Sequence, residues 1–399
     1  MTPAVRSGLD HLLASPDLLD ELRGRRLALL VNPTSVTASL DHAIEALQAA
    51  GLTIRRLFGP EHGVRATAQD MIGVDEARDP VSGLPTVSLY GADEASLHPD
   101  PGTLDDLDVL LFDIQDVGAR YYTYQATLGY VMRVAGRVGT QILVLDRPNP
   151  IDGVTVEGNR VQPGYESFVG AFPLAVRHGM TMGELARFFQ RHCEVACELE
   201  VVPCEGWRRE QWFDETGLPW VYPSPNMPTL DTATIYPGLC LVEGTNLSEG
   251  RGTTRPFHLV GAPWLDPQAF TTRCRESAER AGLQGVGFRP AAFLPGYQKH
   301  AGVGCRGVEI HVFDRRALDA FLLGMIVVEA ARACDPERFA WRTETYEYVD
   351  DPIAIDLLTG SDAYRRAVEE GGDLRELLRS WGPELEEFRA QRAECLLYD

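Results

Sequence analysis

The chain has 399 residues and a formal net charge of −21 at pH 7, with 37 basic against 58 acidic side chains. This length favours two domains, and the acidic balance argues against a nucleic-acid partner and against stable association with an anionic membrane. Hydrophobic residues make up 44% of the chain, enough to build a buried core, which argues against disorder.

Cysteine usage and the N-terminal sequence bear on the compartment. The eight cysteines are scattered and contain no C-x-x-C pair, so we interpret them mostly as buried, reduced thiols. The first residues lack the continuous apolar segment of a signal peptide. No later stretch has the ~18 consecutive apolar residues that a membrane span requires. We therefore expect a cytoplasmic protein, with an exported location open if a leader precedes this sequence.

The first 150 residues contain five short aliphatic runs that end in turn residues. We predict strands at 26–31, 52–58, 85–90, 107–113 and 141–146, and helical spacing is found at 40–50 and 127–138. Strands that alternate with helices predict βαβ units and a parallel sheet covered on both faces. The first part of the chain is therefore predicted to form a Rossmann-like α/β domain.

The rest of the chain predicts a second, smaller α/β (α+β) domain. A long polar loop is expected at 64–83, and loops of that length in compact domains are more often functional than idle. Prolines crowd 219–237, which predicts an irregular passage without helix or central strand. Beyond it, a strand is predicted at 307–312 and helices at 316–334 and from 364 onward. We place the two domains at 1–232 and 233–399.

Polar side chains follow the strands of the first domain where each strand ends. Right-handed crossovers bring the carboxyl ends of parallel strands to one edge, where open α/β sheets bind ligands. The motifs for dinucleotides, nucleoside triphosphates and a nucleophilic serine elbow are missing, so we expect neither a cofactor nor a resident metal. The side chains expected at this edge are Asn32, Glu61, His62, Tyr90, Asp113, Gln115, Asp116, Arg120, Asp146, Arg147 and Asn149.

Three later segments add candidates. Arg177 and His178 come just before Thr181, which forms a helix-starting capping box with Glu184. Asn226 lies in the proline-rich passage, which either faces the cleft or is a rigid spacer. A glycine-rich loop at 241–254 either approaches a ligand closely or is only a surface loop. Its polar candidates are Glu243, Asn246, Glu249 and Arg251.

A series of ordered motifs carries a family resemblance. The motifs lie at 60–63, 79–85, 88–91, 112–124, 145–150, 177–181, 223–228 and 243–253. Together they resemble the NamZ-type exo-β-N-acetylmuramidases over residues from about 8 to the C-terminus. The resemblance implies a Rossmann-like domain, a smaller C-terminal domain, and a cleft that releases N-acetylmuramic acid from the non-reducing end of peptidoglycan fragments. One departure is Val64-Arg65-Ala66, where the family usually has Phe-Arg-Gly.

The chemistry of a glycosidase suggests roles for these residues. Cleavage of a β-glycosidic bond requires a proton donor at the leaving oxygen and a group that stabilises the oxocarbenium-like centre. We assign Glu61 as the general acid, beside His62. The 2-acetamido group of the sugar is a possible nucleophile, which Asp113 or Asp116 would orient. Glu243 and Glu249 from the second domain are rival partners.

Substrate recognition suggests further roles. The lactyl carboxylate of muramic acid requires a cation, and the candidates for this clamp are Arg120, Arg147, Arg177 and Arg251. Tyr121, Tyr122 and Tyr124 either stack on the sugar ring or belong to the core. The other predicted substrate contacts are Asn32, Arg65, Tyr90, Gln115, Asn149, His178, Asn226 and Asn246.

Three other functions stay open at this point. A β-N-acetylglucosaminidase would use the same acid but tolerate loss of the lactyl group. A non-catalytic muropeptide-binding protein would keep the arginine clamp and the aromatic residues. A metal-dependent hydrolase would use His62, Asp113 and Asp116, although these residues lack a compact ligand motif.

Overall fold

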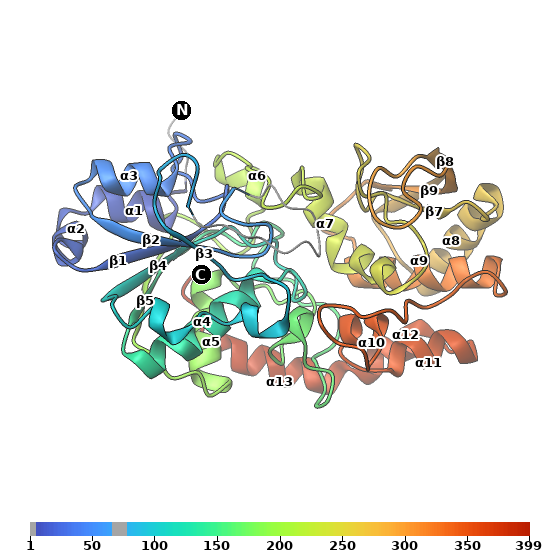
Figure 1. Ribbon diagram of the computed structural model, residues 1–399. Coiled ribbons are helices and arrows are strands. Elements are labelled where there is room, and N and C mark those ends of the chain that lie inside the picture. The colour runs from blue at the N-terminus through green and yellow to red at the C-terminus, as the bar shows by residue number, and fades with distance from the viewer. Residues whose placement is uncertain (1–4, 66–77) are drawn as a thin grey trace.

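The structure is a computed structural model that describes residues 5–65 and 78–399. Figure 1 shows two domains side by side, an α/β domain with the larger sheet and a smaller domain with β7, β8 and β9. Much of the long loop expected at 64–83 lies outside the described residues. In the described part of the chain, no helix is both long enough and apolar enough to cross a membrane.

The first domain is built on a six-stranded sheet in the order β3-β2-β1-β4-β5-β6, with every neighbouring pair parallel. This is the strand order of Rossmann folds, so the predicted architecture is confirmed. The strands are β1 (Leu27–Val31), β2 (Ile54–Gly59), β3 (Thr86–Ser88), β4 (Val109–Asp113), β5 (Gln141–Leu145) and β6 (Leu199–Val202). The strand predicted at 85–90 is shorter than expected.

Helices cover both faces of this sheet because its strands are apolar on both sides (Figure 1). In β1, Leu27, Leu29 and Val31 pack in one apolar cluster, while Ala28 and Leu30 belong to the cluster on the opposite face. The first cluster includes α1 (Gly8–Ala14), α2 (Pro16–Leu22) and α3 (Ala43–Ala49), and the second includes α4 (Tyr124–Val138) and α5 (Met182–His192). The alternation along one strand therefore fixes which helices lie on which side.

The second domain is smaller and of the α+β type, as predicted. Its antiparallel sheet has the order β7-β9-β8. Its elements are α7 (Leu230–Leu239), β7 (Leu259–Ala262), α8 (Pro267–Ala281), β8 (Val286–Phe293), β9 (Cys305–Val312) and α9 (Ala320–Cys334). The backbones of α7 and α9 are in close contact at Gly238. A larger residue would not fit there, because a Cβ on Gly238 would lie 1.8 Å from the Ala320 carbonyl oxygen.

One secondary-structure prediction is wrong. The passage at 219–237 was expected to contain no helix, yet α7 begins at Leu230 and includes Pro237. The helix ends two residues after this proline, at Leu239, so the missing N–H affects only its last turn. Before α7, the chain forms the short helix α6 (Phe213–Thr216) and then an irregular stretch.

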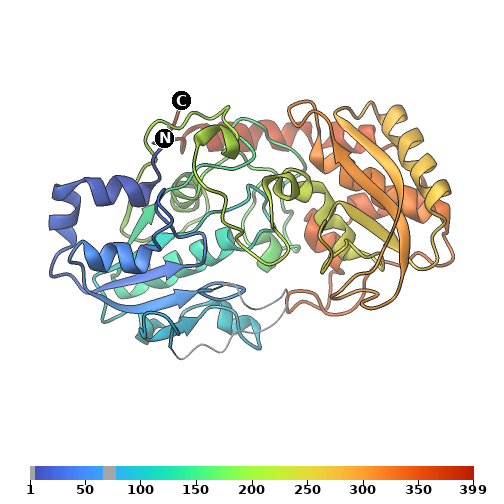
Figure 2. The ribbon, with the colours of Figure 1, turned by 90° about the horizontal axis from the view of Figure 1, so that it is seen from above.

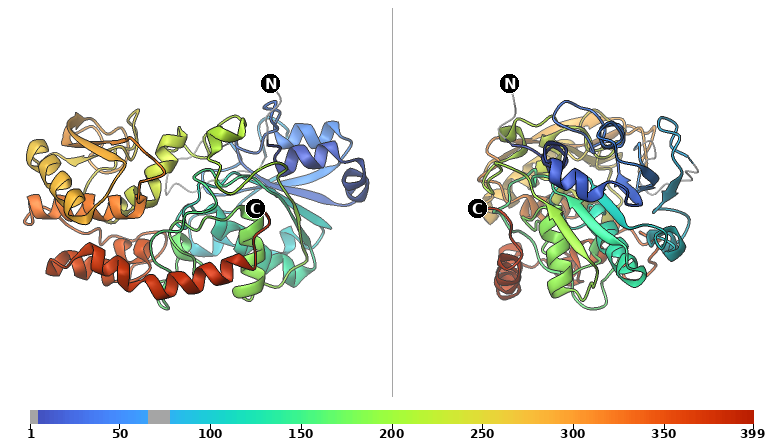
Figure 3. Two further views of the ribbon diagram at one scale, coloured as in Figure 1. Left: turned by 180° about the vertical axis from the view of Figure 1, so that it is seen from behind. Right: turned by 90° about the vertical axis from the view of Figure 1, so that its left-hand side faces the viewer.

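The C-terminal helices connect the two domains. They are α10 (Ala354–Thr359), α11 (Ala363–Glu370), α12 (Leu374–Ser380) and α13 (Gly382–Ala393). Figures 2 and 3 show this segment running from the second domain back along the first, with the C-terminus beside the first domain. There the Leu397 N–H donates to the Glu184 carboxylate at 2.8 Å, and the Tyr398 hydroxyl donates to Asp146 at 2.5 Å. The end of the chain thus stabilises the first domain.

Candidate active site

A pocket with an empty volume of about 460 Å³ lies where the two domains meet. The first domain and the passage to α7 contribute Glu61, His62, Tyr121, Tyr122, Thr123, Tyr124, Val169, Ser224, Asn226 and Met227, and the second domain contributes Tyr236, Glu243, Arg251, Phe257, Tyr346 and Glu347. The structure therefore brings together predicted site residues from both domains.

The turn after β2 places a carboxylic acid in this pocket. Pro60 ends the strand, and the Gly63 N–H donates to the Pro60 carbonyl at 2.8 Å to close the turn. His62 adopts a left-handed backbone with φ of 69°, which is uncommon for a residue other than glycine. Glu61 and His62 are only 5% and 7% exposed. Uncommon backbone conformations of this kind cluster at functional sites.

The two oxygens of Glu61 differ in their contacts. The Thr123 hydroxyl, just before α4, donates to Oε2 at 2.6 Å. Oε1 is buried and has no hydrogen-bond partner among the described residues. A buried carboxylate oxygen without a donor is unfavourable, and such exceptions in a folded protein call for an explanation. One oxygen is therefore anchored, and the other can accept a hydrogen bond from a ligand hydroxyl or, in the protonated form, donate one to a glycosidic oxygen.

Three tyrosines form an aromatic wall of the pocket. The Tyr121 hydroxyl donates to the Pro237 carbonyl, and the Tyr124 hydroxyl donates to the Pro223 carbonyl at 2.6 Å. The Tyr122 ring meets Tyr124 edge-on, with 5.0 Å between centroids. Burial raises the pKa of all three hydroxyls well above the usual range, so they are neutral hydrogen-bonding groups.

On the second domain, Arg251 lies between two carboxylates. Its guanidinium donates to Glu243 at 2.5 Å and to Glu249 at 2.9 Å. The Tyr346 hydroxyl also donates to Glu243, at 2.8 Å, and the Lys299 ammonium lies 3.0 Å from Glu249. Burial alone would raise the pKa of Glu249, but the charges of Lys299 and Arg251 lower it below its usual value. The second domain therefore contributes an ordered, ionised network.

Several predicted site residues lie outside the pocket lining. Asp113 and Arg147 form a buried bidentate ion pair with distances of 2.5 and 2.9 Å. Burial lowers the pKa of Arg147, but Asp113 raises it by more, so the arginine is charged. Asp116 accepts the Gly118 N–H at 2.7 Å, and His178 Nε2 lies 3.6 Å from the same oxygen. The other Asp116 oxygen is buried and unpaired in the described part of the chain.

The predicted amides mostly support the backbone. Asn32 accepts from the Thr34 N–H at 2.9 Å, Gln115 donates to the Pro148 carbonyl at 2.8 Å, and Asn149 donates to the Met180 carbonyl at 2.9 Å. Asn246 donates to the Arg338 carbonyl at 2.8 Å. These four residues lie outside the pocket lining, whereas Asn226 is part of it and accepts from the Gly252 N–H at 3.4 Å.

Two further predicted residues, Arg65 and Tyr90, pair with carboxylates. Arg65 forms a bidentate ion pair with Asp79, with both distances 2.8 Å, and this pair holds the pKa of Asp79 well below its usual value. The Tyr90 hydroxyl donates to Glu347 at 3.1 Å, so Tyr90 positions a carboxylate that lines the pocket.

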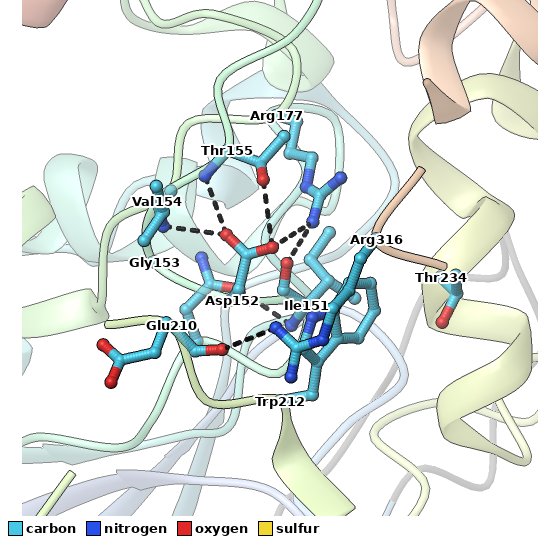
Figure 4. A network of polar contacts seen from close by, with 12 residues as sticks. Ile151, Asp152, Gly153, Val154, Thr155, Arg177, Glu210, Trp212, Thr234 and Arg316 are labelled. Atoms are coloured by element: carbon cyan, nitrogen blue, oxygen red, sulfur yellow. Dashed lines mark hydrogen bonds and ion pairs between the residues drawn. The ribbon is translucent and has the colours of Figure 1, made fainter. Parts of the chain in front are cut away.

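The four candidate arginines differ in their surroundings. Arg177 pairs with Glu157 at 2.7 Å and with Asp152 at 2.8 Å, and Figure 4 shows its contact with Asp152. Arg120 donates to the carbonyls of Asn159, Leu174 and Leu358 at 2.6, 2.9 and 2.7 Å. Arg147 is committed to Asp113. Of the four, Arg251 lines the pocket.

Sequence reasoning missed several pocket residues, namely Thr123, Tyr236, Phe257, Tyr346 and Glu347. Thr123 lies inside the motif at 112–124, so its position next to the predicted tyrosines was the available signal. Glu347 and Tyr348 have positive φ values of 46° and 68°. Such left-handed positions are not readable from residues that are neither glycine nor asparagine.

The site carries no grouping typical of a metal centre in the part that the structure describes. Among residues 5–65 and 78–399, no cluster of three or more histidine, cysteine, aspartate or glutamate side chains is arranged to hold a metal ion.

A Rossmann-like domain and a smaller α+β domain share a carboxylate-lined, aromatic pocket, which is the arrangement of a two-domain protein that binds a small molecule between its domains. The family models for the N-terminal and C-terminal domains of the exo-β-N-acetylmuramidase NamZ match residues 27–231 and 234–398. The chain therefore belongs to the NamZ family.

Individual proteins agree with this assignment. The chain is 40% identical over 397 residues to the peptidoglycan β-N-acetylmuramidase NamZ of Bacillus subtilis (strain 168), covering 99% of this chain and 92% of that protein. A crystal structure of a DUF1343 family protein from Bacteroides fragilis NCTC 9343 is similar over the full length of both chains, with a TM-score of 0.86 and 31% identity. A second such protein from the same organism matches with a TM-score of 0.74 and 27% identity, over 99% of each chain.

Proposed function

We propose that this protein is an exo-acting β-N-acetylmuramidase that releases N-acetylmuramic acid from the non-reducing end of peptidoglycan fragments. The observation that carries the proposal is Glu61, whose Oε1 is buried and unpaired among the described residues while Thr123 anchors Oε2. The same carboxyl group lines the pocket between the two domains of a NamZ-family chain.

In this proposal Glu61 donates the proton to the leaving oxygen, and Thr123 holds the carboxyl group in position. General acids in enzymes act through such positioned groups, and they contribute typically 10²- to 10⁴-fold to the rate. His62, the next residue, lines the same pocket and is the second predicted catalytic group of this turn.

The group that orients the acetamido substituent is a second part of the proposal. Asp113 is committed to Arg147. Asp116 lies outside the pocket lining, but its charge acts on the Tyr122 and Tyr124 hydroxyls of the pocket, so it is the stronger candidate from the first domain. Its unpaired oxygen resembles that of Glu61. Glu243, which lines the pocket from the opposite domain, is the rival candidate. Glu249 is bound to Lys299 and Arg251 and supports this side of the pocket.

Arg251 is the proposed partner of the lactyl carboxylate, because it lines the pocket and the other three candidate arginines do not. Its guanidinium is already oriented by Glu243 and Glu249, so little further ordering is needed when the substrate binds. The tyrosines of the aromatic wall are proposed to contact the sugar ring.

The experiment compares two disaccharides that differ in the lactyl group at the non-reducing sugar. Purified protein is incubated with MurNAc-GlcNAc and with GlcNAc-GlcNAc, and the released monosaccharides are quantified for the wild type and for Glu61→Gln. We expect release of MurNAc from the first disaccharide and almost none from the second. Glu61→Gln, which keeps the shape of the side chain, is expected to lower the rate of release about 10³-fold.

The two other functions predict different results. Comparable cleavage of both disaccharides would indicate a β-N-acetylglucosaminidase. Tight binding of MurNAc-GlcNAc to a folded wild type that releases nothing would indicate a muropeptide-binding protein and overturn the proposal.

Location, domain division and physiological role are further parts of the proposal. We propose that the enzyme acts in muropeptide recycling in the cytoplasm, a view supported by the eight cysteines, which are all free thiols, as is usual in a reducing compartment. We also propose the division at 1–232 and 233–399, with the C-terminal segment returning to the first domain. Cell fractionation tests the location, and limited proteolysis tests the division.

A further inference from the structure

A second hollow lies next to the candidate active site, on the second domain. It has an empty volume of about 1330 Å³, against about 460 Å³ for the active-site pocket. One side is formed by the loop between β8 and β9, with Tyr297, Gln298 and Lys299, and the other by Trp341, Arg342 and Thr343.

The hollow and the active-site pocket share a wall. The Arg342 N–H donates to the Gly244 carbonyl and the Asn246 N–H donates to the Ala340 carbonyl, both at 2.9 Å, so two extended segments run side by side. Residues at one end of this ribbon, Glu243 and Tyr346, line the active-site pocket, whereas Trp341 lines the hollow. The ribbon therefore separates the two cavities, with residues of one segment contributing to both.

Lys299 connects the loop that forms the hollow to the segment that lines the active-site pocket. Its ammonium donates to the carbonyls of Val242 and Thr245 at 2.8 and 3.1 Å. It also pairs with Glu249, which in turn holds Arg251 of the active-site pocket. The position of the β8–β9 loop is therefore coupled to the second-domain side of the active site.

The backbone of this loop is unusual. Gln298 and His300, on either side of Lys299, both have left-handed backbones, with φ of 56° and 59°. The His300 ring contacts the Asn246 carbonyl at 2.8 Å and so holds the loop against the ribbon. Residues in sparsely populated conformations persist only where the surrounding contacts impose them, and they cluster at ligand sites.

We infer that this hollow binds the aglycone glycan, the sugar residues on the leaving-group side of the cleaved bond. The inference rests on the proposed function. Tyr297 and Trp341 supply aromatic rings that are partly exposed, and amphipathic aromatic rings suit sugars, which have both apolar faces and hydroxyl edges. Gln298 and Thr343 add neutral hydrogen-bonding groups. Such a mixture of aromatic surface and few polar groups is typical of a small-molecule site.

The charge of the hollow favours glycan over the stem peptide, which carries several carboxylates. The Lys299 ammonium is neutralised by Glu249. The Arg342 guanidinium lies over the Tyr346 ring, 4.9 Å from its centroid, and Glu344 faces the same hollow. The cations lining the hollow thus have acidic or aromatic neighbours, which suits the uncharged GlcNAc residue that directly follows the cleaved bond.

The test compares one substrate that reaches the hollow with one that does not. The first is the peptide-free tetrasaccharide of alternating MurNAc and GlcNAc, and the second is a chromogenic β-N-acetylmuraminide with a small aryl group. Tyr297→Ala removes one ring, and Thr343→Trp fills the hollow from its exposed side. The matched control is Phe313→Ala, which truncates an exposed aromatic residue just after β9, outside the hollow.

We expect Tyr297→Ala and Thr343→Trp to lower kcat/KM for the tetrasaccharide about tenfold, the size of effect typical for loss of an aromatic contact. Hydrolysis of the chromogenic muraminide is expected to stay within about twofold of the wild type, and Phe313→Ala to change neither substrate. Thermal unfolding identifies a variant that fails to fold. In that case the other variant alone tests the inference.

Several results would overturn the inference while leaving the proposed function intact. These are equal losses on both substrates, no loss on the tetrasaccharide, or a loss that appears only when the substrate carries stem peptides. A folded wild type that cleaves no muraminide would instead refute the proposed function, and the inference would fall with it.

Discussion

The turn after β2 and the ends of β4 and β5 carry similar polar residues at the same edge of the sheet, yet they use their hydrogen bonds differently. After β2, Glu61 anchors one oxygen on Thr123 and keeps the other unpaired in the described structure. At the ends of β4 and β5, Asp113 and Arg147 satisfy each other in a bidentate pair. Polar residues that directly follow parallel strands are therefore brought together at one edge of the sheet. A reactive group differs from a structural one in having a polar atom that faces a pocket and lacks a hydrogen-bond partner in the protein.

The arginines show the same contrast. The terminal nitrogens of Arg120 and Arg177 bind closed sets of protein acceptors outside the pocket lining, and the Nε–H of each has no partner among the described residues. Arg251, in contrast, is oriented by two carboxylates at the surface of the pocket. A substitution in a closed set should lower the free energy of unfolding. A substitution of a pocket residue should instead lower the rate of hydrolysis or the preference for one substrate.

The largest effect on stability is expected from breaking the closed pair. Asp113→Ala leaves the Arg147 charge buried without its partner, and we expect a loss of ~3–5 kcal/mol in the free energy of unfolding. Urea denaturation measures this change. If the Asp113→Ala protein has nearly wild-type stability but no longer hydrolyses the substrate, Asp113 belongs to the active site. The contrast between Glu61 and the Asp113–Arg147 pair would then be wrong.

A pH dependence of stability is expected from Asp146, whose carboxylate is buried beneath the C-terminal residues. Burial raises its pKa from the ordinary 3.8 to about 6, against opposing hydrogen bonds from Tyr398, Thr181 and Gly183. The folded protein therefore binds this proton more tightly than the unfolded chain. The resulting stabilisation, up to ~3 kcal/mol at 1.36 kcal/mol per unit, is present at low pH and is lost as the pH rises through about 6.

This contribution is isolated by comparing the unfolding free energy of the wild type with that of Asp146→Asn from pH 4 to 7. The difference between the two proteins should change across this range, with the wild type losing stability relative to the variant as the pH rises. A constant difference would show that Asp146 stays ionised throughout and that the hydrogen bonds outweigh burial.

A smaller effect is expected on substrate choice. Arg251→Met removes the proposed partner of the lactyl carboxylate, so the preference for MurNAc-GlcNAc over GlcNAc-GlcNAc should fall about 30-fold, or ~2 kcal/mol. The ratio of the two kcat/KM values is the measurement. Arg177→Met is the control from a closed network, and it should lower stability without changing this ratio. An unchanged ratio in Arg251→Met would show that another residue binds the lactyl carboxylate.

The smallest expected effect concerns the anchor of the acid. Thr123→Val removes the hydroxyl that donates to Glu61 and should lower kcat about fivefold, equivalent to ~1 kcal/mol for one hydrogen bond, with little change in KM. Thr123→Ser restores the donor and should restore kcat. If serine fails to do so while valine folds normally, the threonine acts through packing and not through its hydroxyl.

Much of the fold could be predicted because its signals are local. Continuous aliphatic runs such as 107–113 and 141–146 indicated buried parallel strands, and the structure has β4 and β5 there. Strands β7 and β8 were not predicted, since β8 contains Pro290 and small residues that do not produce a clear pattern. Helix α7 was missed because Pro237 near its end resembled a break. Tertiary packing on α9 decides in favour of the helix.

The site could be predicted only in part, for a physical reason. A sequence shows which groups reach the edge of the sheet, but not which of them meet each other. Arg147 lies 34 residues after Asp113, and only the sheet register places their side chains in contact. Glu347 lines the pocket from a segment far along the chain, and its backbone is left-handed. No pattern in the sequence predicts this conformation.

The central claim, that Glu61 donates the proton to the leaving oxygen, is tested most directly by varying the leaving group. Rates of the wild type and Glu61→Gln are compared on MurNAc-GlcNAc, whose leaving sugar must be protonated, and on a muraminide with an acidic dinitrophenol. We expect a loss of about 10³-fold on the disaccharide and of less than about tenfold on the dinitrophenyl substrate, which departs without a proton. Equal losses on both substrates would contradict the assignment of Glu61 as the acid.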